Sequence, residues 1–307
     1  MAFSTAPVIF DRELLARRRN RAAQAGVFPD FLLRRTAEDF AERLSLIKRT
    51  FTRALVLGAA NGVLVEALSG TAGIAEIVAC ETAPACLGEQ RNLAVIADEE
   101  ALPFRDQSFD LVVSGLTLQF VNDLPGTLAQ IRRLLRPDGL FLGAMIGGET
   151  LTELRKAVLA AEIELCDGVS PRVAPFADVR DIGALLQRAG FALPVADSDV
   201  VTVTYPTPFE LMRELKAMGA SNVLVERRRV PMTRGMLVRI AEIYKEHFVK
   251  DAGRIPATFE ILTMTGWSPH ESQQKPLRPG AAAARLADAL GTDERSAGEA
   301  APAPDLP

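Results

Sequence analysis

From Arg53 onward, short apolar runs alternate with segments that have helical periodicity. The apolar runs are ALVLG (54–58), AEIVACE (75–81), LAVIADEE (93–100), FDLVVSGL (109–116) and GLFLGAMI (139–146). The helical segments lie near Gly62–Ser69, Ala83–Gln90, Leu124–Leu135 and Leu151–Leu165. The runs are apolar throughout rather than at every second position, which is typical of strands buried on both faces. This alternation predicts an α/β fold with a parallel sheet covered by helices on both faces.

Further elements follow these five runs. A helical segment ends at Gly190, in the position of a C-terminal cap, and leads into the strand-like run ALPVADSDVVTVTY. Two amphipathic helices are expected at about Pro208–Met218 and Thr233–Val249, before a last strand candidate, IPATFEILTMTGW. The helix pair is therefore predicted to be an insertion, at about 206–250, between the last two strands.

The two ends of the chain differ from this core. Residues 1–52 show apolar positions at helical spacing among many charges, which predicts helices that pack on the core. The core domain itself is predicted to span 53–276. Residues 277–307 are rich in Ala, Pro and Gly, and we expect this tail to be mostly disordered.

The composition narrows the class of protein. A formal net charge of -4 gives no general attraction to phosphate backbones, so nucleic acid is not an expected partner. Three cysteines without a CxxC spacing indicate a reduced compartment. No stretch reaches the length of a membrane-spanning helix, and the first residues lack the basic-then-apolar order of a secretory signal. We therefore expect a soluble, cytoplasmic protein.

The turn after the first predicted strand, Gly58 to Gly62, is the first candidate for ligand binding. In an open parallel sheet the ligand lies beyond the carboxyl ends of the strands, and this turn comes nearest to it. Glycines let the backbone approach a ligand and leave amide groups at the helix start free to meet a negative group. Two glycines alone are weak evidence, because many turns contain such a pair.

Acidic residues end the next two predicted strands. Glu81 lies 23 residues after Gly58, about where an acidic side chain accepts hydrogen bonds from ribose hydroxyls in such folds. Asp98 and Glu99 end the third strand, and Ser114 ends the fourth. Taken singly, an acidic residue at a strand end is more often a solvated cap. Their placement at successive strand ends predicts a ligand that carries adenosine.

These residues carry a resemblance to a known family. The order of LVLGAANG, Glu81 and ADEEALPFRDQSFDLVVSGL resembles that of the class I S-adenosylmethionine-dependent methyltransferases of the type 11 kind. Within it the chain is similar to the complex I assembly factor 5 group and its bacterial relatives, neighbours of the malonyl carrier-protein methyltransferase of biotin synthesis. GGETLTELR, FELMRELKAMGASN and GWSPHESQ carry this narrower resemblance, which covers about Ile9 to Pro276.

The resemblance implies a fold and a cofactor site. The expected fold is a doubly wound, mostly parallel seven-stranded sheet of Rossmann-like type, and the expected cofactor is S-adenosyl-L-methionine. The implied cofactor-binding residues are Gly58, Ala60, Gly62, Glu81, Asp98, Glu99, Ser114 and Leu116. Family members usually carry an acid where Val56 stands and a glycine where Ala60 stands. Loss of a hydrogen bond to a charged group weakens binding by roughly ten- to a hundred-fold, so this departure bears directly on cofactor affinity.

Methyl transfer from a sulfonium needs no catalytic triad, because the cofactor carries the chemistry and the protein aligns the acceptor. The catalytic residues are therefore left unknown, and an amine or alcohol acceptor would need a base whereas a carboxylate would not. The candidates for acceptor binding are Gln119, Tyr205 and His270. The inserted helices are expected to stand over the cleft, and FDRELLARRRNRAA (10–23) to close it from the other side. The acceptor, a protein or a small molecule, is left open.

The family resemblance implies two alternatives to methyl transfer. Members of the mitochondrial group are associated with hydroxylation of an arginine on a complex I subunit, but a non-haem iron site needs two histidines and a carboxylate. The chain has only His247 and His270, and neither opens an HxD pair, so no metal site is predicted. A non-catalytic assembly factor is favoured by Val56 and Ala60 and opposed by Glu81 and Asp98. A complex I subunit is the implied partner, in the mitochondrial matrix if the source is eukaryotic.

Overall fold

The computed structural model describes residues 7–26, 28–71, 73–88, 93–166, 168–249, 253–274 and 286–292. The chain divides into two units, Met1–His270 and Glu271–Pro307. The second unit contains the short helix α9 (Leu286–Leu290), and most of the tail predicted to be disordered lies outside the described residues. All that follows concerns the first unit.

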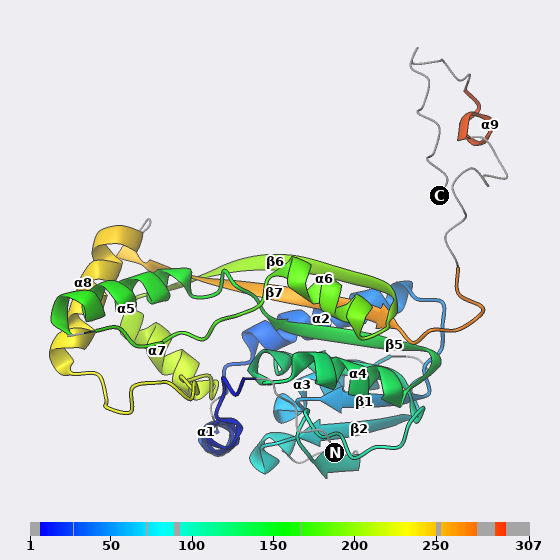
Figure 1. Cartoon of the computed structure of the whole chain (residues 1–307), viewed down its shortest axis with the longest axis horizontal. Coiled ribbons are helices and arrows are strands. Elements are labelled where there is room, and N and C mark those ends of the chain that lie inside the picture. Colours follow the sequence, from blue (N-terminus) through cyan, green and yellow to red (C-terminus); the bar gives the residue numbers. More distant parts are fainter. Residues whose placement is uncertain are drawn as a thin grey trace. The chain divides into compact units, whose positions relative to one another are not determined.

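A single seven-stranded sheet forms the centre of this unit (Figure 1). Its strands lie in the order β3-β2-β1-β4-β5-β7-β6, with the pairs from β3 to β5 parallel and β7 antiparallel to both neighbours. The strands are β1 (Arg53–Leu57), β2 (Glu76–Glu81), β3 (Leu93–Ile96), β4 (Phe109–Gly115), β5 (Leu135–Ile146), β6 (Ala192–Tyr205) and β7 (Ile255–Trp267). The predicted doubly wound, mostly parallel seven-stranded sheet is confirmed.

Helices cover both faces of the sheet, and the strand residues alternate between the two cores. On one face, Phe40 and Leu64 pack with Val56 and Val113. On the other, Ile131 packs with strand residues that include Leu55 and Phe141. Nearly every position of the central strands β1 and β4 meets one core or the other, which is why these two runs are largely apolar, whereas the edge strands β3 and β6 have exposed positions. The helices are α1 (Arg12–Gln24), α2 (Phe31–Leu46), α3 (Val63–Ser69), α4 (Leu124–Leu134), α5 (Thr152–Leu165), α6 (Val179–Arg188), α7 (Pro208–Ala217) and α8 (Arg234–Phe248), with 3-10 turns η1 (Ala60–Gly62), η2 (Pro84–Leu87) and η3 (Leu118–Phe120).

One predicted helix is much shorter than expected. The segment Ala83–Gln90 forms only the 3-10 turn η2, and Gly88 beyond it has a φ of 62°. A left-handed residue directly after the turn ends the helical geometry, which the apolar spacing of the segment does not reveal. Residues 89 and 90 lie outside the described part of the chain.

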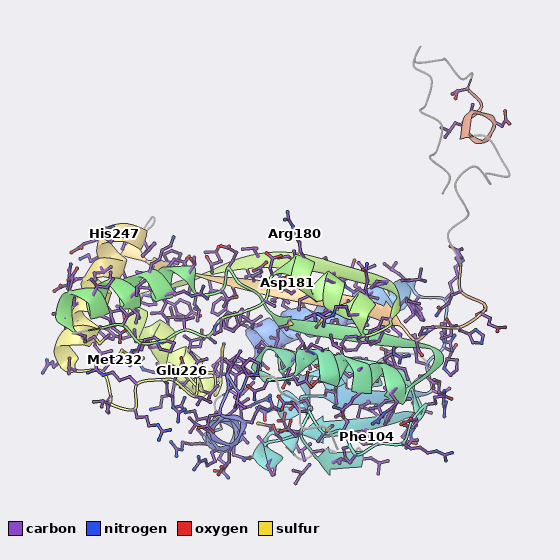
Figure 2. All side chains as sticks on the ribbon, viewed as in Figure 1. Phe104, Arg180, Asp181, Glu226, Met232 and His247 are labelled. Atoms are coloured by element: carbon purple, nitrogen blue, oxygen red, sulfur yellow. The ribbon has the colours of Figure 1, made fainter. Side chains whose placement is uncertain are left out.

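The β6–β7 pair extends beyond the sheet as a two-stranded ribbon (Figure 1). β5 pairs with β7 only between Ile261 and Trp267, whereas β6 pairs with β7 as far as Ile255. The ribbon carries α5 and α8: Tyr244 donates to the Pro256 carbonyl at 2.7 Å. His247 lies on α8, near the outer end of this ribbon (Figure 2). No helix within the described ranges is both long and apolar enough to cross a membrane.

Candidate active site

The turn after β1 lies at the carboxyl edge of the sheet and requires glycine. Gly58 has a φ of 75°, and its N–H donates to the Cys80 carbonyl at 2.9 Å. A Cβ atom at Gly58 would lie 3.0 Å from the Thr117 side chain, which follows β4. Gly62 has a φ of 86° at the start of α3. The positive φ and the close approach together exclude a side chain at Gly58, as expected of a ligand-facing turn.

Glu81 ends β2 at the same edge and is 1% exposed. Its Oε1 accepts a hydrogen bond from the Ala83 N–H at 3.2 Å and forms an ion pair with Nη1 of Arg19 at 3.4 Å. Arg19 comes from α1 and also donates to Oγ1 of Thr117 at 3.2 Å. Burial opposes the charge of Arg19, but the carboxylates of Glu81 and Glu99 outweigh it and raise the pKa of Arg19.

Asp98 and Glu99 follow β3 and are bound by a second arginine of α1. Arg12 donates to Oδ1 of Asp98 at 2.6 Å and also to Glu99. Glu99 is buried, and its Oε1 accepts from the Thr117 hydroxyl at 2.7 Å. Burial again opposes the cation, but the two carboxylates raise the pKa of Arg12. The acidic residues predicted to hold adenosine therefore converge, and α1 supplies their counter-charges.

The sequence predicts that α1 closes the cleft but does not indicate these ion pairs. Arg12 and Arg19 are about two helical turns apart, so they share one face of α1. The seven-residue spacing of the two arginines is visible in the sequence and indicates that both lie on one face of the helix. Which carboxylates the arginines meet depends on how α1 packs against η2 and against the segment after β3, and no local pattern encodes that packing.

The remaining predicted cofactor residues lie on the same edge. Ser114, at the end of β4, is fully buried, and its Oγ has no hydrogen-bond partner among the described residues. Leu116 has a φ of 51°, and its N–H donates to the Ala144 carbonyl at 2.9 Å. Ala60 lies in η1, with its side chain outside the described part of the structure. Val56 is fully buried in the core, so the position where relatives usually carry an acid is apolar here.

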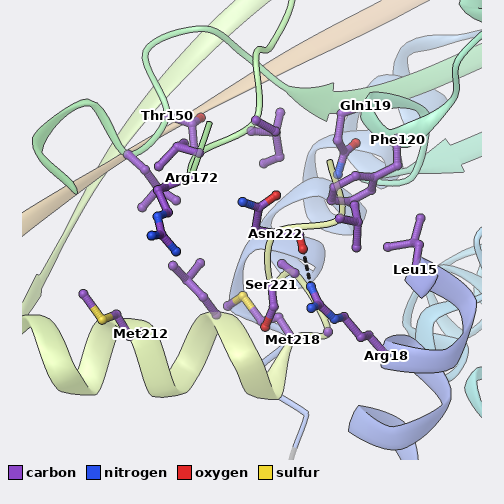
Figure 3. A pocket seen from close by; sticks show the side chains of 18 of the residues that line it. Leu15, Arg18, Gln119, Phe120, Thr150, Arg172, Met212, Met218, Ser221 and Asn222 are labelled. Carbon is purple, nitrogen blue, oxygen red and sulfur yellow. Dashed lines mark hydrogen bonds between the residues drawn. The ribbon is translucent and has the colours of Figure 1, made fainter. Parts of the chain in front are cut away.

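A cavity of about 730 Å³ adjoins this edge, between α1, η3, α7 and the segment after α7 (Figure 3). Gly115, Leu116 and Gln119 form its wall at the end of β4. Most of the lining is apolar, with side chains that include Leu15, Phe28, Leu32, Val158, Phe176, Met212, Leu215 and Met218. Its charged lining consists of Arg18, Arg19, Arg172, Arg227, Arg228 and Arg229.

The three predicted acceptor residues lie in different places. Gln119 lines the cavity, where its Nε2 donates to the Leu116 carbonyl at 2.8 Å and its buried Oε1 has no partner among the described residues. Tyr205 is buried at the end of β6 and donates to Glu214, and burial and that carboxylate raise its pKa. His270 is exposed beyond Trp267, which pairs with Leu140 near the start of β5. The structure therefore brings only Gln119 to the cavity, and His270 follows the opposite edge of the sheet.

The described residues contain no group of three or more His, Cys, Asp or Glu side chains placed to hold a metal ion. Burial raises the pKa of Cys80 to about 12 and that of Cys86 to about 11. Both thiols are therefore protonated at neutral pH and poor nucleophiles.

Comparisons with known proteins identify the family to which this sheet and its candidate site belong. Residues 55–143 match the methyltransferase domain family. The chain is 41% identical over 280 residues to the mitochondrial arginine-hydroxylase NDUFAF5 of Homo sapiens, covering 89% of this chain and 81% of that protein. It is 39% identical over 244 residues to a malonyl-acyl-carrier-protein O-methyltransferase of Halorhodospira halophila, covering 77% and 81% of the two chains. The chain belongs to the S-adenosylmethionine-dependent methyltransferases.

The fold of these methyltransferases extends to distant structures. The YcgJ protein of Bacillus subtilis superposes with a TM-score of 0.54 at 13% identity, over 77% of this chain and 99% of that one. At that identity the likeness concerns the fold alone. The relatives at about 40% identity place the chain in the branch of the family that contains NDUFAF5 and the malonyl-carrier-protein enzymes, and S-adenosylmethionine is the family's cofactor.

Proposed function

We propose that this methyltransferase transfers the methyl group of S-adenosylmethionine to an acceptor held in the arginine-lined cavity. One observation carries the proposal: the cavity wall at Gly115 and Leu116 belongs to the same sheet edge that brings Gly58 and Glu81 together. Donor and acceptor sites therefore adjoin at the end of β4, as transfer between two bound molecules requires.

We propose a contact for each part of the cofactor. In this proposal Gly58 and Gly62 present backbone amides to its methionine end, Glu81 accepts from the ribose, and Asp98 with Glu99 frames the adenine. Ser114 and Leu116 face the sulfonium side. The buried Oγ of Ser114 and Oε1 of Gln119, which have no partner among the described residues, offer polar contacts that a ligand would complete.

The cofactor, when bound, supplies an activated methyl group, and the protein positions the acceptor in line with it. Apolar side chains from α7, including Met212 and Leu215, would limit the water around the reacting atoms. This division of labour requires no catalytic triad.

Calorimetric titration of the purified protein with S-adenosylmethionine tests the proposal. We expect a saturable heat of binding, and transfer of a labelled methyl group to an acceptor in cell extract. No heat at millimolar cofactor would favour a non-catalytic scaffold instead.

A role in the assembly of respiratory complex I is our second proposal, supported by the family resemblance and by the similarity to NDUFAF5. The mitochondrial location named for those relatives suits the matrix of a eukaryote, and the bacterial cytoplasm is the corresponding place in a bacterium. Mass spectrometry of respiratory subunits from cells that lack the protein tests this role. A lost methyl or hydroxyl mark on a complex I subunit supports the role, and a lost hydroxyl contradicts methyl transfer as its chemistry. An unchanged set of marks contradicts a modification of complex I by this protein.

A further inference from the structure

The long strand β6 forms one edge of the sheet. It has 14 residues, whereas β3 at the opposite edge has 4. Within the described sheet β6 is hydrogen-bonded to β7 alone, and it lies outermost in Figure 1. An outer strand carries a row of N–H and C=O groups that can pair with a further strand.

The contacts of β7 show which backbone groups of β6 face this edge. In an antiparallel pair, opposite residues alternate between those that bond to each other and those that bond away from each other. The Thr258 N–H donates to Oε2 of Glu153 at 3.1 Å, and the Glu260 N–H donates to Oγ1 of Thr150 at 2.9 Å. The backbone groups of these two β7 residues therefore point away from β6.

The β6 residues opposite those two are Thr202 and Val200, so their N–H and C=O groups point outward, to the open edge. Thr204 follows the same alternation, and its carbonyl accepts a hydrogen bond from Arg254 at 2.6 Å. Within the described part of the chain, the backbones of Thr202 and Val200 form no hydrogen bond outside the β6–β7 pair. A further strand would supply the missing partners.

The run Val200–Thr204 has the composition of a pairing segment. Its sequence, VVTVT, contains only uncharged, β-branched residues, which favour strands. The side chain of Val200 belongs to a residue that is 56% exposed, and the two threonines are exposed as well. An exposed, uncharged edge of this kind is a template for another strand.

The run is complementary to itself. When two copies lie antiparallel about Thr202, this residue meets its own copy, Val201 meets Val203, and Val200 meets Thr204. Outward-pointing residues then face outward-pointing residues, so up to about six backbone hydrogen bonds can form. Cross-strand pairs of valine and threonine stabilise such a ladder.

The residues around the run disfavour other alignments. A slide by one residue places outward groups against inward ones. A slide by two residues in one direction brings Asp199 opposite Val203, and in the other direction it brings Pro206, which has no N–H, opposite Val200. The favoured alignment has two-fold symmetry, so pairing closes at two copies.

From these observations we propose that a second copy of this chain pairs with β6, with Val200–Thr204 of the two copies antiparallel about Thr202. The sheet of each copy then continues into the sheet of the other. Interfaces below about 1,000 Å² are weak, and a ladder of this length is short, so we expect a reversible dimer with a dissociation constant of about 10 to 100 µM. Strands β4, β5 and β7 separate this edge from β1, so the dimer leaves the candidate cofactor site unchanged.

Sedimentation velocity of the full chain, from well below to well above that dissociation constant, tests the proposal. The wild-type chain should change from monomer to dimer as its concentration rises. Thr202→Lys and Thr202→Glu each place like charges opposite each other at the two-fold axis, so each should weaken the dimer by at least about ten-fold. An equimolar mixture of these two variants sets lysine against glutamate and should restore the dimer.

Two further substitutions at Thr202 separate the side chain from the backbone. Thr202→Ala is the matched control, because it keeps the outward N–H and adds no charge, and it should weaken the dimer by less than about three-fold. Thr202→Pro removes the outward N–H without breaking a bond to β7, so it should abolish the dimer. Thermal unfolding of each variant separates a lost interface from a lost fold.

The outcomes decide the proposal. Loss of the dimer in both charged variants and its return in their mixture support pairing about Thr202, and neither misfolding nor general repulsion explains that return. A wild-type chain that stays monomeric at every concentration overturns the proposal. A dimer that both charged variants retain also overturns it, because that dimer forms through another surface, such as the β3 edge.

Discussion

The candidate site has two compartments, the sheet edge and the adjoining cavity, and they differ in whether their charged side chains have partners of opposite charge. At the sheet edge, the carboxylates of Glu81, Asp98 and Glu99 are neutralised by arginines from α1. In the adjoining cavity, Arg18 on the same helix has no carboxylate partner among the described residues. Charges that are paired within the protein stabilise the fold and do not indicate the charge of the ligand. Unpaired charges in a cavity indicate the charge that a ligand must bring.

Breaking a pair at the sheet edge is expected to have the largest effect. Glu81→Gln leaves Arg19 buried beside a neutral amide, so we expect the free energy of unfolding to fall by about 3 kcal/mol. Cofactor affinity should fall by at least about ten- to a hundred-fold, because the proposed acceptor for the ribose hydroxyls loses its charge. Urea unfolding and calorimetric titration with S-adenosylhomocysteine measure the two losses.

Two further variants separate the effect of the buried ion pair on stability from the effect of Glu81 on cofactor binding. Glu76→Gln, at the other end of β2, breaks the half-exposed pair with Arg53 and should cost under about 1 kcal/mol. The double variant Glu81→Gln with Arg19→Met should recover much of the stability but none of the cofactor affinity. Full recovery of both would show that Glu81 only balances Arg19 and does not touch the cofactor.

Gln119 lies where the two compartments meet and should have an intermediate effect. Gln119→Leu removes a buried oxygen that has no described partner and one hydrogen bond, from Nε2 to the Leu116 carbonyl, so we expect the free energy of unfolding to fall by about 1 kcal/mol. Affinity for S-adenosylmethionine should fall by about three- to ten-fold, and by less for S-adenosylhomocysteine, whose sulfur is uncharged.

Gln130→Leu is the contrasting variant for Gln119→Leu. Gln130 accepts from the Leu102 N–H at 3.0 Å and donates to the Glu100 carbonyl at 2.8 Å, so its loss leaves two backbone groups unsatisfied. We expect it to lower stability by about 1 to 3 kcal/mol. Equal loss of affinity for both cofactor forms in Gln119→Leu would contradict a contact with the sulfonium side.

The smallest expected effect is that of pH on methyl transfer. The described lining of the cavity contains no histidine, cysteine, lysine, tyrosine or acidic residue, so it holds no side chain that ionises near neutrality. The initial rate of methyl transfer to an acceptor in cell extract should therefore show no ionisation between about pH 6 and pH 8. A rate that rises through a single ionisation near pH 7 would contradict this expectation and reveal a base outside the described lining.

The sheet edge was largely predictable from the sequence. Continuous apolar runs identify buried parallel strands, and parallel strands place their carboxyl ends together, so Gly58, Glu81 and Asp98 were expected to be neighbours. The cofactor half of the site follows from local patterns of this kind. Val56 in the core also shows that a departure from the family pattern can be filled by ordinary apolar packing.

The cavity was much less predictable, because long-range packing forms it. Tyr205 ends β6 but is held by Glu214, nine residues later in the chain. His270 follows β7, and the antiparallel direction of that strand takes it to the far edge. Arg18 and Asn222 are brought together from α1 and from the segment after α7. A direction reversal and a contact over 204 positions leave no periodic signal in the sequence.

Helix α1 joins the two compartments through consecutive residues. Arg19 binds the carboxylate of β2, and Arg18 faces the cavity. A helix moves as a rigid rod over so short a distance, so a ligand that shifts α1 at one compartment changes the geometry of the other. If the cofactor changes the affinity for the acceptor by some factor, the acceptor changes the affinity for the cofactor by the same factor. Helix α1 therefore couples the binding of donor and acceptor.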